Sequence, residues 1–550
     1  MARLLMKNAS HIVTCDPSDT VYTDSNLLME DGVITYIGPE EQQAEEVIDA
    51  AGCIVYPGLI NTHHHLYQTF SRNLPQVQNL ELFDWLKALY EIWKNLDSRV
   101  IYHSSVTGMG ELMKNGCTTC FDHHYVFPQG QAEGLLDAQF AAAEDLGIRM
   151  YASRGSMDLS KKDGGLPPDS VVQTVDEILR DCQRAVETYH DPSRFSMRMV
   201  ALAPCSPFSV SEELLRQSAI LARDLGVRLH THLCETKDEE RFVRERCGMR
   251  PLEYMESLGW IGPDVWYAHG IHFNGEELRR LAETGTGVAH CPISNMKLSS
   301  GVCRVPEMLE LGVPVGLAVD GSASNDGSNL LEELRVAYLL HRLQSSEKAP
   351  SGYDVLKIAT VGSAKILGRD DIGSLEVGKA GDLFAIDTRR LEMVGADLDP
   401  KSLLGTVGWK GPVDHTVVNG KVTVRNGKLV NLDEEKAARE AAALVRDYLA
   451  GPTETGLLHP ALKPGRLVIY PKNEQYAARI FRAACLLVRT VCPARAAPFP
   501  GQGPLAENWQ DIGPSATVLQ TAAWEEKVQK AYFETFTIIQ TLLFLPGMLD

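Results

Sequence analysis

Short apolar runs alternate with helix-like segments through the middle of the chain. The runs are rich in β-branched, aromatic and aliphatic residues, and the segments between them repeat apolar positions with helical spacing. Strands that alternate with helices favour parallel βα units, and eight such units predict an α/β fold built as a (β/α)8 TIM-like barrel. A doubly wound open sheet is the structural alternative. The eight runs cover residues 54–56, 118–121, 149–153, 197–203, 227–232, 265–269, 287–291 and 315–319.

Short β-rich strings separated by turns occur on both sides of this region. The early strings lie within residues 3–37, and the later ones lie within residues 383–430. The two sets could complete one sheet that flanks the region between them. The sequence therefore predicts a composite β-sandwich from residues 1–57 and 375–430, with the barrel in residues 58–374 and a C-terminal helix in residues 431–450.

The remaining residues, 451–550, differ from the rest of the chain. They are richer in proline and nearly balanced in charge, and they contain no chemical motif. This extra tail is either an added oligomerisation element or a sequence without a selected fold. We expect truncation after Ala450 to leave activity intact.

Composition and charge narrow the possible partners. The formal net charge of −19 over 550 residues gives the chain no general electrostatic attraction for nucleic acid. It lacks an apolar leader and any run near the roughly 20 apolar residues that span a membrane. We therefore expect a cytoplasmic protein that contacts neither nucleic acid nor membrane, keeps its cysteines reduced and forms a homo-oligomer.

Histidine and carboxylate residues follow several of the predicted barrel strands. His63 and His65 form an H-x-H pair after the first run, and alternate residues of an extended chain project to the same side. His232, His269 and Asp320 lie at or just beyond the ends of three later runs, at the end of the barrel where active sites are built. Imidazoles with one carboxylate suit a borderline divalent ion, so the pattern predicts a site for one divalent metal, with Zn favoured and Fe as the alternative.

The motifs that contain these residues resemble those of a known family. PGLINTHHH, HTHLCE, YAHGIHF and VDGSASND are similar, in order and spacing, to motifs of the amidohydrolase superfamily, in the branch of aminohydrolases that act on amino-substituted nitrogen heterocycles. The resemblance implies that His269 contacts the attacking water or the substrate and that Glu235 is the proton shuttle. It also implies a metal bound by His63, His65, His232 and Asp320.

Elementary chemistry agrees with those implied roles. A divalent ion brings the pKa of its bound water towards about 7. Asp320 can then take a proton as hydroxide attacks a ring carbon that bears an amine. Glu235 would protonate the adjacent ring nitrogen and then the departing amine, and His269 would stabilise the tetrahedral centre. The products are a ring carbonyl and ammonia.

Narrower motifs around residues 65–75, 153–168 and 291–301 resemble the subgroup that acts on flat, amide-bearing azaheterocycles. This resemblance implies 8-oxoguanine as the favoured small-molecule substrate, converted to urate and ammonia. A triazine or pterin aminohydrolase of the hydroxydechloroatrazine or isoxanthopterin type is the alternative within the enzyme class. The alternative outside the enzyme class is a catalytically silent relative that serves as a scaffold. Such a protein would lack a metal ligand or the proton shuttle, and this sequence retains all of them.

Four side chains are candidates for binding the substrate. Gln68 and Arg154 could hydrogen-bond an amide-rich ring, Trp85 could stack on its face, and His123 could line the pocket. Three of them have a structural alternative: Gln68 as a helix cap, Arg154 as the partner of Asp122, and Trp85 as core packing. His230 lies two residues before His232 on the same strand face, so it is interpreted as a filled barrel layer.

Overall fold

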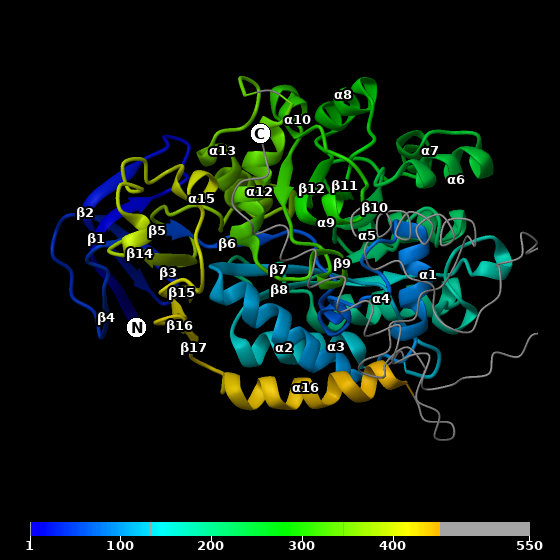
Figure 1. Ribbon diagram of the computed structural model, residues 1–550, viewed down its shortest axis with the longest axis horizontal. Coiled ribbons are helices and arrows are strands. Elements are labelled where there is room, and N and C mark those ends of the chain that lie inside the picture. The colour runs from blue at the N-terminus through cyan, green and yellow to red at the C-terminus, as the bar shows by residue number, and fades with distance from the viewer. Residues whose placement is uncertain (1, 132–133, 345, 452–550) are drawn as a thin grey trace, which may run out of the picture. The chain divides into compact units, whose positions relative to one another are not determined.

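Eight parallel strands form a barrel in the order β13-β12-β11-β10-β9-β8-β7-β6 (Figure 1). The computed structural model describes residues 2–131, 134–344 and 346–451, and none of the helices in these ranges is long and apolar enough to cross a membrane. The strands are β6 (Leu59–Asn61), β7 (Cys117–His124), β8 (Arg149–Ser156), β9 (Arg198–Pro204), β10 (Leu229–Leu233), β11 (Val265–His269), β12 (Gly287–His290) and β13 (Val315–Leu317).

The first and last strands of this sheet lie next to each other. The backbone N–H of Thr62 donates to the carbonyl oxygen of Leu317 at 3.2 Å, and the N–H of Asp320 donates to that of His63 at 3.1 Å. Large apolar side chains such as Phe121 and Trp266 fill the interior. The predicted fold class, a TIM-like barrel, is therefore confirmed.

Helices follow every barrel strand and cover its outside. The first connection contains the short helix η1 (Leu66–Ser71), then α1 (Leu82–Trp93) and α2 (Ser98–Lys114). The later connections contain α3 (Leu135–Leu146), η2 (Lys161–Asp163), η3 (Asp169–Val171), α4 (Val175–Tyr189), α5 (Glu212–Asp224), α6 (Lys237–Cys247), α7 (Pro251–Ser257), α8 (Gly275–Thr284), α9 (Pro292–Lys297), α10 (Val305–Leu311), α11 (Ser322–Asn325), α12 (Leu330–Arg342), α13 (Gly352–Lys357), η4 (Ile358–Gly362) and α14 (Ser363–Ile366).

A second, nine-stranded sheet contains strands from both ends of the described chain. Its centre is β5, which pairs parallel with β1 and antiparallel with β14 and so joins the two flanks. The predicted boundaries between the units remain predictions. The strands are β1 (Arg3–Val13), β2 (Val21–Glu30), β3 (Val33–Gly38), β4 (Glu46–Asp49), β5 (Cys53–Pro57), β14 (Leu383–Asp387), β15 (His415–Val418), β16 (Lys421–Arg425) and β17 (Lys428–Leu429).

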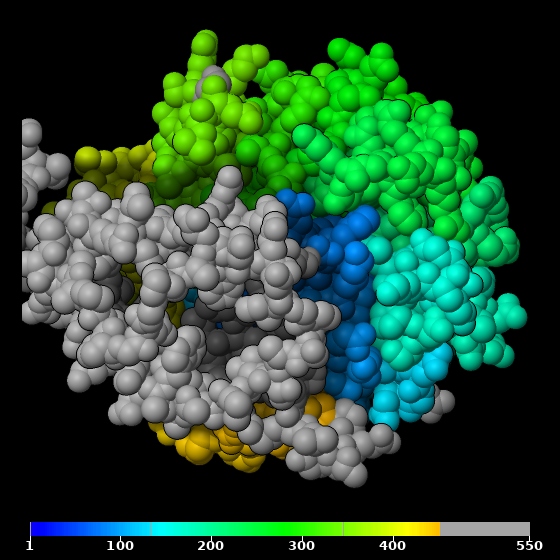
Figure 2. All heavy atoms as spheres, turned by 45° about the vertical axis from the view of Figure 1, so that its right-hand side comes forward, coloured from blue at the N-terminus to red at the C-terminus, as the bar shows by residue number. Residues whose placement is uncertain are grey.

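Two short helices, η5 (Leu391–Met393) and α15 (Leu403–Thr406), lie between β14 and β15, and α16 (Glu434–Ala450) follows the last strand. Figure 1 shows α16 running alongside α2, and Figure 2 shows it in orange at the lower edge of the face that carries the blue N-terminal barrel segments. Apart from Gly451, the predicted tail lies outside the described residues.

One predicted barrel strand was wrong. The run 54–56 belongs to β5 of the second sheet, where Tyr56 pairs with Phe384 of β14. The first barrel strand is β6, which begins after Pro57 and Gly58. Both strands are fully buried and mostly apolar, so the pattern of apolar residues does not show which sheet each strand belongs to.

Candidate metal centre and pocket

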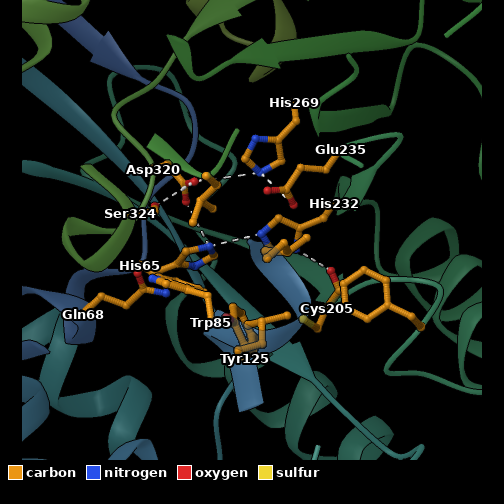
Figure 3. A pocket seen from close by; sticks show the side chains of 14 residues that line it. His65, Gln68, Trp85, Tyr125, Cys205, His232, Glu235, His269, Asp320 and Ser324 are labelled. Carbon is orange, nitrogen blue, oxygen red and sulfur yellow. Dashed lines mark hydrogen bonds and ion pairs between the residues drawn. The ribbon is translucent and has the colours of Figure 1, made fainter. Parts of the chain in front are cut away.

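Three histidine rings and one carboxylate meet at the carboxyl ends of the barrel strands, and Figure 3 shows His65, His232 and Asp320 of this set. His63 and His65 follow β6, His232 lies in β10, and Asp320 follows β13. The Nε2 atoms of His65 and His232 are 3.1 Å apart. Asp320 Oδ1 lies 3.2 Å from His65 Nε2 and 3.3 Å from His63 Nε2. The structure therefore brings the four predicted ligands together, and all are buried.

Hydrogen bonds to backbone carbonyls orient two of these rings. His65 Nδ1 lies 2.7 Å from the carbonyl oxygen of His123, and His232 Nδ1 lies 2.6 Å from that of Cys205. A carbonyl oxygen only accepts, so each Nδ1 carries the proton. Burial holds the pKa of His232 well below its usual value, so this ring is neutral. His232 Nε2 therefore turns a lone pair towards the cluster, where it faces His65 Nε2 at 3.1 Å.

The same reasoning applies to His63 through a second histidine. His230 Nδ1 lies 2.9 Å from the Trp266 carbonyl and donates to it, which leaves His230 Nε2 as the acceptor for His63 Nδ1 at 2.8 Å. Burial lowers the pKa of both imidazoles well below the usual value. His63 Nε2 is buried and has no hydrogen-bond partner among the described residues. His230 thus lies behind His63 and supports it.

The cluster therefore gathers imidazole nitrogens and a carboxylate oxygen that face one another at about 3 Å. Its carboxylate is stabilised as an anion, because Ser294 Oγ donates to Asp320 Oδ2 at 2.6 Å and the Gly321 N–H donates to Oδ1 at 2.6 Å. Lone pairs about 3 Å apart repel one another in a buried site. Three imidazole nitrogens and one carboxylate oxygen fit a divalent cation, which would remove that repulsion.

Glu235 and His269 lie beside this donor set (Figure 3). His269 Nε2 is 3.6 Å from Glu235 Oε2 and 3.9 Å from Asp320 Oδ2, and its Nδ1 lies 2.9 Å from Asn295 Oδ1. Burial raises the pKa of Glu235 well above its usual value, and the negative charge of Asp320 adds to the shift. The pocket therefore favours the protonated form of Glu235 more strongly than water does.

A pocket opens onto these groups, and two predicted substrate-binding residues line it. Both amide atoms of Gln68 and the Nε1 atom of Trp85 are buried without a hydrogen-bond partner in the described parts of the chain, so they are available to a ligand. The pocket is lined by His65, Gln68, Leu82, Trp85, Leu86, Tyr125, Cys205, Phe208, His232, Glu235, His269, Leu298, Asp320 and Ser324.

Arg154 does not line this pocket, so its predicted contact with substrate is corrected. Its guanidinium lies 2.5 Å from Asp181 of α4 and 2.8 Å from Gln173, and it stacks on Phe127. Alternate residues of a strand face opposite sides. Tyr151 belongs to the barrel interior, so Arg154, an odd number of positions away, points outward to the helices. Asp122, the partner considered from sequence, is not the one observed.

His123 also lies outside the pocket wall. Its ring stacks on His232 with centroids 4.8 Å apart, and its Nε2 donates to the carbonyl oxygen of Ala203 at 2.8 Å. It belongs to the buried histidine cluster together with the predicted ligands. Its place is inside the barrel, behind the pocket.

Sequence reasoning missed several residues of the site. Tyr125 follows the His123-His124 pair directly, and Ser324 lies within the VDGSASND motif, so their positions carried a signal. Cys205 and Phe208 follow the fourth barrel strand, for which no polar marker was singled out. Ser294 was missed because its hydroxyl reaches Asp320 in the next βα unit of the chain.

The chain matches a family model and has close relatives among characterised proteins. The model of the amidohydrolase family matches residues 54–423. Hydroxydechloroatrazine ethylaminohydrolase of Pseudomonas sp. strain ADP is 44% identical over 82% of this chain and 97% of its own length. 8-Oxoguanine deaminase of Pseudomonas aeruginosa is 44% identical over 82% of this chain and 100% of its own.

Solved structures agree with this assignment. Atrazine chlorohydrolase of Arthrobacter aurescens TC1, crystallised with zinc, is 34% identical, with a TM-score of 0.78 over 80% of this chain and 100% of its own. The resemblance seen in the motifs is therefore confirmed by the fold and by the whole sequence. This chain belongs to the amidohydrolase family.

Proposed function

We propose that this protein is a metal-dependent aminohydrolase that converts 8-oxoguanine to urate and ammonia. The observation that carries the proposal is the convergence of three imidazole nitrogens and the Asp320 carboxylate beside the buried side chain of Glu235. The 8-oxoguanine deaminase relative supports the substrate. A cytoplasmic location and a homo-oligomeric state remain predictions.

The metal proposed is a single zinc ion, with iron as the alternative. The donor set of neutral imidazoles and a carboxylate suits such a borderline ion, and the structural neighbour crystallised with zinc supports it. When bound, the ion supplies positive charge that acidifies a water molecule. The residues that would hold it are His63, His65, His232 and Asp320.

The chain's own acids and bases then move the protons. Glu235 donates its proton to the ring nitrogen next to the carbon that bears the amine, and Asp320 accepts a proton from the attacking water. His269 Nε2, between the two carboxyl groups, orients that water. A proton returned through Glu235 converts the amine into a leaving group, so the ring gains a carbonyl oxygen and ammonia departs.

The polar groups of the pocket that lack a partner within the described residues are an argument for a substrate with an amide-bearing ring. The unpartnered amide of Gln68 can donate to and accept from the lactam edge of a purine. Trp85 offers a flat apolar face against which the ring can stack. Neither group needs to leave another partner to bind the substrate.

A hydroxylated alkylamino-triazine is the alternative substrate, and one feature of the pocket favours it. Leu82, Leu86, Phe208 and Leu298 form an apolar part of the wall, which could accept an N-alkyl group. The ethylaminohydrolase relative is as similar to this chain as the deaminase relative is.

The test is turnover by purified, zinc-loaded protein on 8-oxoguanine, guanine, isoxanthopterin and hydroxydechloroatrazine. Each reaction is followed by the change in absorbance of the heterocyclic ring, and the ammonia or ethylamine released is quantified. We expect 8-oxoguanine to have the highest kcat/KM and Glu235→Gln to lower kcat by roughly 100-fold or more. Faster triazine turnover would select the alternative. If the protein binds metal but converts none of the four compounds, the proposed function is overturned.

A further inference from the structure

A buried carboxylate without a role in the proposed chemistry lies directly behind Glu235. Glu239, the third residue of α6, has no exposed surface. Its Oε1 accepts a hydrogen bond from the backbone N–H of Cys234 at 2.8 Å, and its Oε2 accepts one from the N–H of Glu235 at 2.9 Å. Both carboxylate oxygens are therefore used to hold two consecutive residues.

This arrangement differs from an ordinary helix cap. In a capping box, a glutamate at the third helical position bonds to the backbone N–H of the N-cap residue itself, as Glu177 does with Thr174 at the start of α4. In α6 the N-cap is Thr236, which bonds to the Glu239 N–H. The Glu239 carboxylate, however, reaches past Thr236 to the two residues before it. It fixes the segment between β10 and α6, beyond what capping requires.

That segment has a conformation that needs support. Cys234 has a φ of 54°, in the left-handed region that residues other than glycine disfavour. The turn directs the Glu235 carboxylate towards His269, with 3.6 Å between Oε2 and Nε2. Within the described residues, the Glu235 carboxylate has no hydrogen bond to another side chain. Its direction therefore depends on the backbone that Glu239 holds.

Two other segments of the site are held in the same way. Asp122 Oδ1 accepts from the Leu66 N–H at 2.6 Å, at the start of the short helix that carries Gln68. Glu333 Oε2 accepts from the Ile293 N–H at 3.2 Å, in the helix that carries Ser294 and Asn295. Both carboxylates are fully buried. A buried carboxylate that accepts hydrogen bonds from backbone N–H groups thus recurs at segments that carry side chains of the site.

We propose that Glu239 is a positioning residue, which fixes the backbone at Cys234 and Glu235 and so directs the Glu235 carboxylate at the site of proton transfer. This inference rests on the proposed function, in which Glu235 is the proton shuttle. A misdirected shuttle slows proton transfer without weakening substrate binding.

The first test compares Glu239→Gln with wild type in the zinc-loaded enzyme. The amide keeps one acceptor oxygen but turns an NH2 group towards the other backbone donor. We expect kcat to fall by roughly 10- to 100-fold, with KM within about threefold and zinc content unchanged. In a Glu235→Gln background the same change should cost nothing further, because the shuttle is already lost. Independent, multiplicative losses would overturn the proposal.

Asp371→Asn is the matched control. Asp371 is also buried, and its Oδ2 accepts from the Phe195 backbone N–H at 2.6 Å, but before β9 at the opposite end of the barrel. We expect it to leave kcat unchanged. If Asp371→Asn lowered kcat as much as Glu239→Gln does, the loss would reflect the removal of any buried carboxylate, and the specific role of Glu239 would be overturned.

A measurement that does not depend on turnover separates this inference from the proposed function. Amide hydrogen exchange at Cys234 and Glu235 should accelerate in Glu239→Gln and stay unchanged in Asp371→Asn. If wild type turns over none of the rings, the proposed function fails and exchange alone decides whether Glu239 holds the segment. Unchanged exchange would overturn the inference. If Glu239→Gln does not fold, Glu239→Asp, which withdraws the carboxylate by one methylene, is measured in the same way.

Discussion

His269 and Asp320 adopt left-handed backbone conformations, with φ values of 71° and 63°, although neither is glycine. Each conformation costs on the order of 1–2 kcal/mol. Both residues lie where the chain leaves a barrel strand, and the sharp turn aims each side chain across the barrel mouth at the cluster. The surrounding hydrogen bonds, such as that from Ser294 to Asp320, hold the strained geometry in place. At this scale, local strain is used to bring functional atoms together.

We expect Gly321→Ala to impair substrate binding through Gln68. An ideal Cβ on Gly321 would lie 1.9 Å from Gln68 Oε1 and 2.4 Å from its Cδ, so the amide must move. Steady-state kinetics should show kcat/KM lower by about tenfold, or about 1.4 kcal/mol, with zinc retained. Gly327→Ala is the control, because the nearest atom to its Cβ is 3.5 Å away. Equal kcat/KM in wild type and Gly321→Ala would contradict a substrate role for Gln68.

At the scale of elements, the two sheets meet where β5 ends and β6 begins. Only Gly58 separates these strands, and its N–H donates to the carbonyl oxygen of Asp382 at 3.0 Å. An ideal Cβ on Gly58 would lie 2.2 Å from the hydroxyl oxygen of Thr118, in β7. The change from one sheet to the other therefore depends on the close approach of backbone and side chain that glycine permits.

Gly58→Ala should destabilise this junction. Overpacking in a closed interior costs about 1–3 kcal/mol, so thermal denaturation should give a clearly lower Tm. Gly275→Ala serves as the control, because its Cβ would meet no atom within 4 Å and alanine suits the first turn of α8. A Tm for Gly58→Ala equal to that of the control would show that Thr118 yields without cost.

The stability that the ion pair between Asp371 and Arg369 contributes should depend on pH. Burial alone would raise the pKa of Asp371, but its ion pair with Arg369, at 2.7 Å, lowers that pKa from 3.8 to about 2. A depressed carboxylate pKa contributes stability above the unfolded value, and this contribution is lost as pH falls from about 4 to about 2. The free-energy gap between wild type and Asp371→Asn should therefore be about 2 kcal/mol larger at pH 7 than at pH 2. A gap independent of pH, measured by urea denaturation, would contradict this.

In the whole molecule, one buried ion pair joins the barrel to the second sheet. Arg149, the first residue of β8, pairs with Asp382 at 2.9 Å, and the two side chains are 2% and 3% exposed. Asp382 lies just before β14 and also accepts from the Asn419 N–H at 2.6 Å. The pair satisfies two charges that neither sheet could bury alone. It therefore couples the stability of the two units.

We expect Arg149→Met to cost about 3–5 kcal/mol, because it leaves the Asp382 carboxylate buried without its partner. The double variant Arg149→Met with Asp382→Leu should be less destabilised than this single variant, since the unpaired charge is then absent. Denaturation of all variants in one double-mutant cycle measures the coupling. Simple additivity of the two changes would indicate that the pair does not join the units energetically.

The sequence by itself determined the fold class and the identity of the central polar residues. Periodicity and chain order are local properties, so strands that alternate with helices, and histidines that follow strands, can be recognised without coordinates. This is why the barrel and a metal site at the strand ends could be predicted, whereas the ligand set of His63, His65, His232 and Asp320 and the role of Glu235 were implied by the resemblance of their motifs to the family.

The tertiary structure decided what depends on contacts between distant segments. Residues 54–56 pair with β14, more than 300 positions away, and no local pattern contains that partner. Arg154 faces the helices because of its phase along β8, which a shift of one residue would reverse. The direction of the lone pairs depends on carbonyls and rings from other strands. The hydrogen bonds from the Cys234 and Glu235 N–H groups to Glu239 depend on a turn in which Cys234, although not a glycine, has a left-handed backbone conformation. Such features follow from packing, which places distant atoms within hydrogen-bond distance.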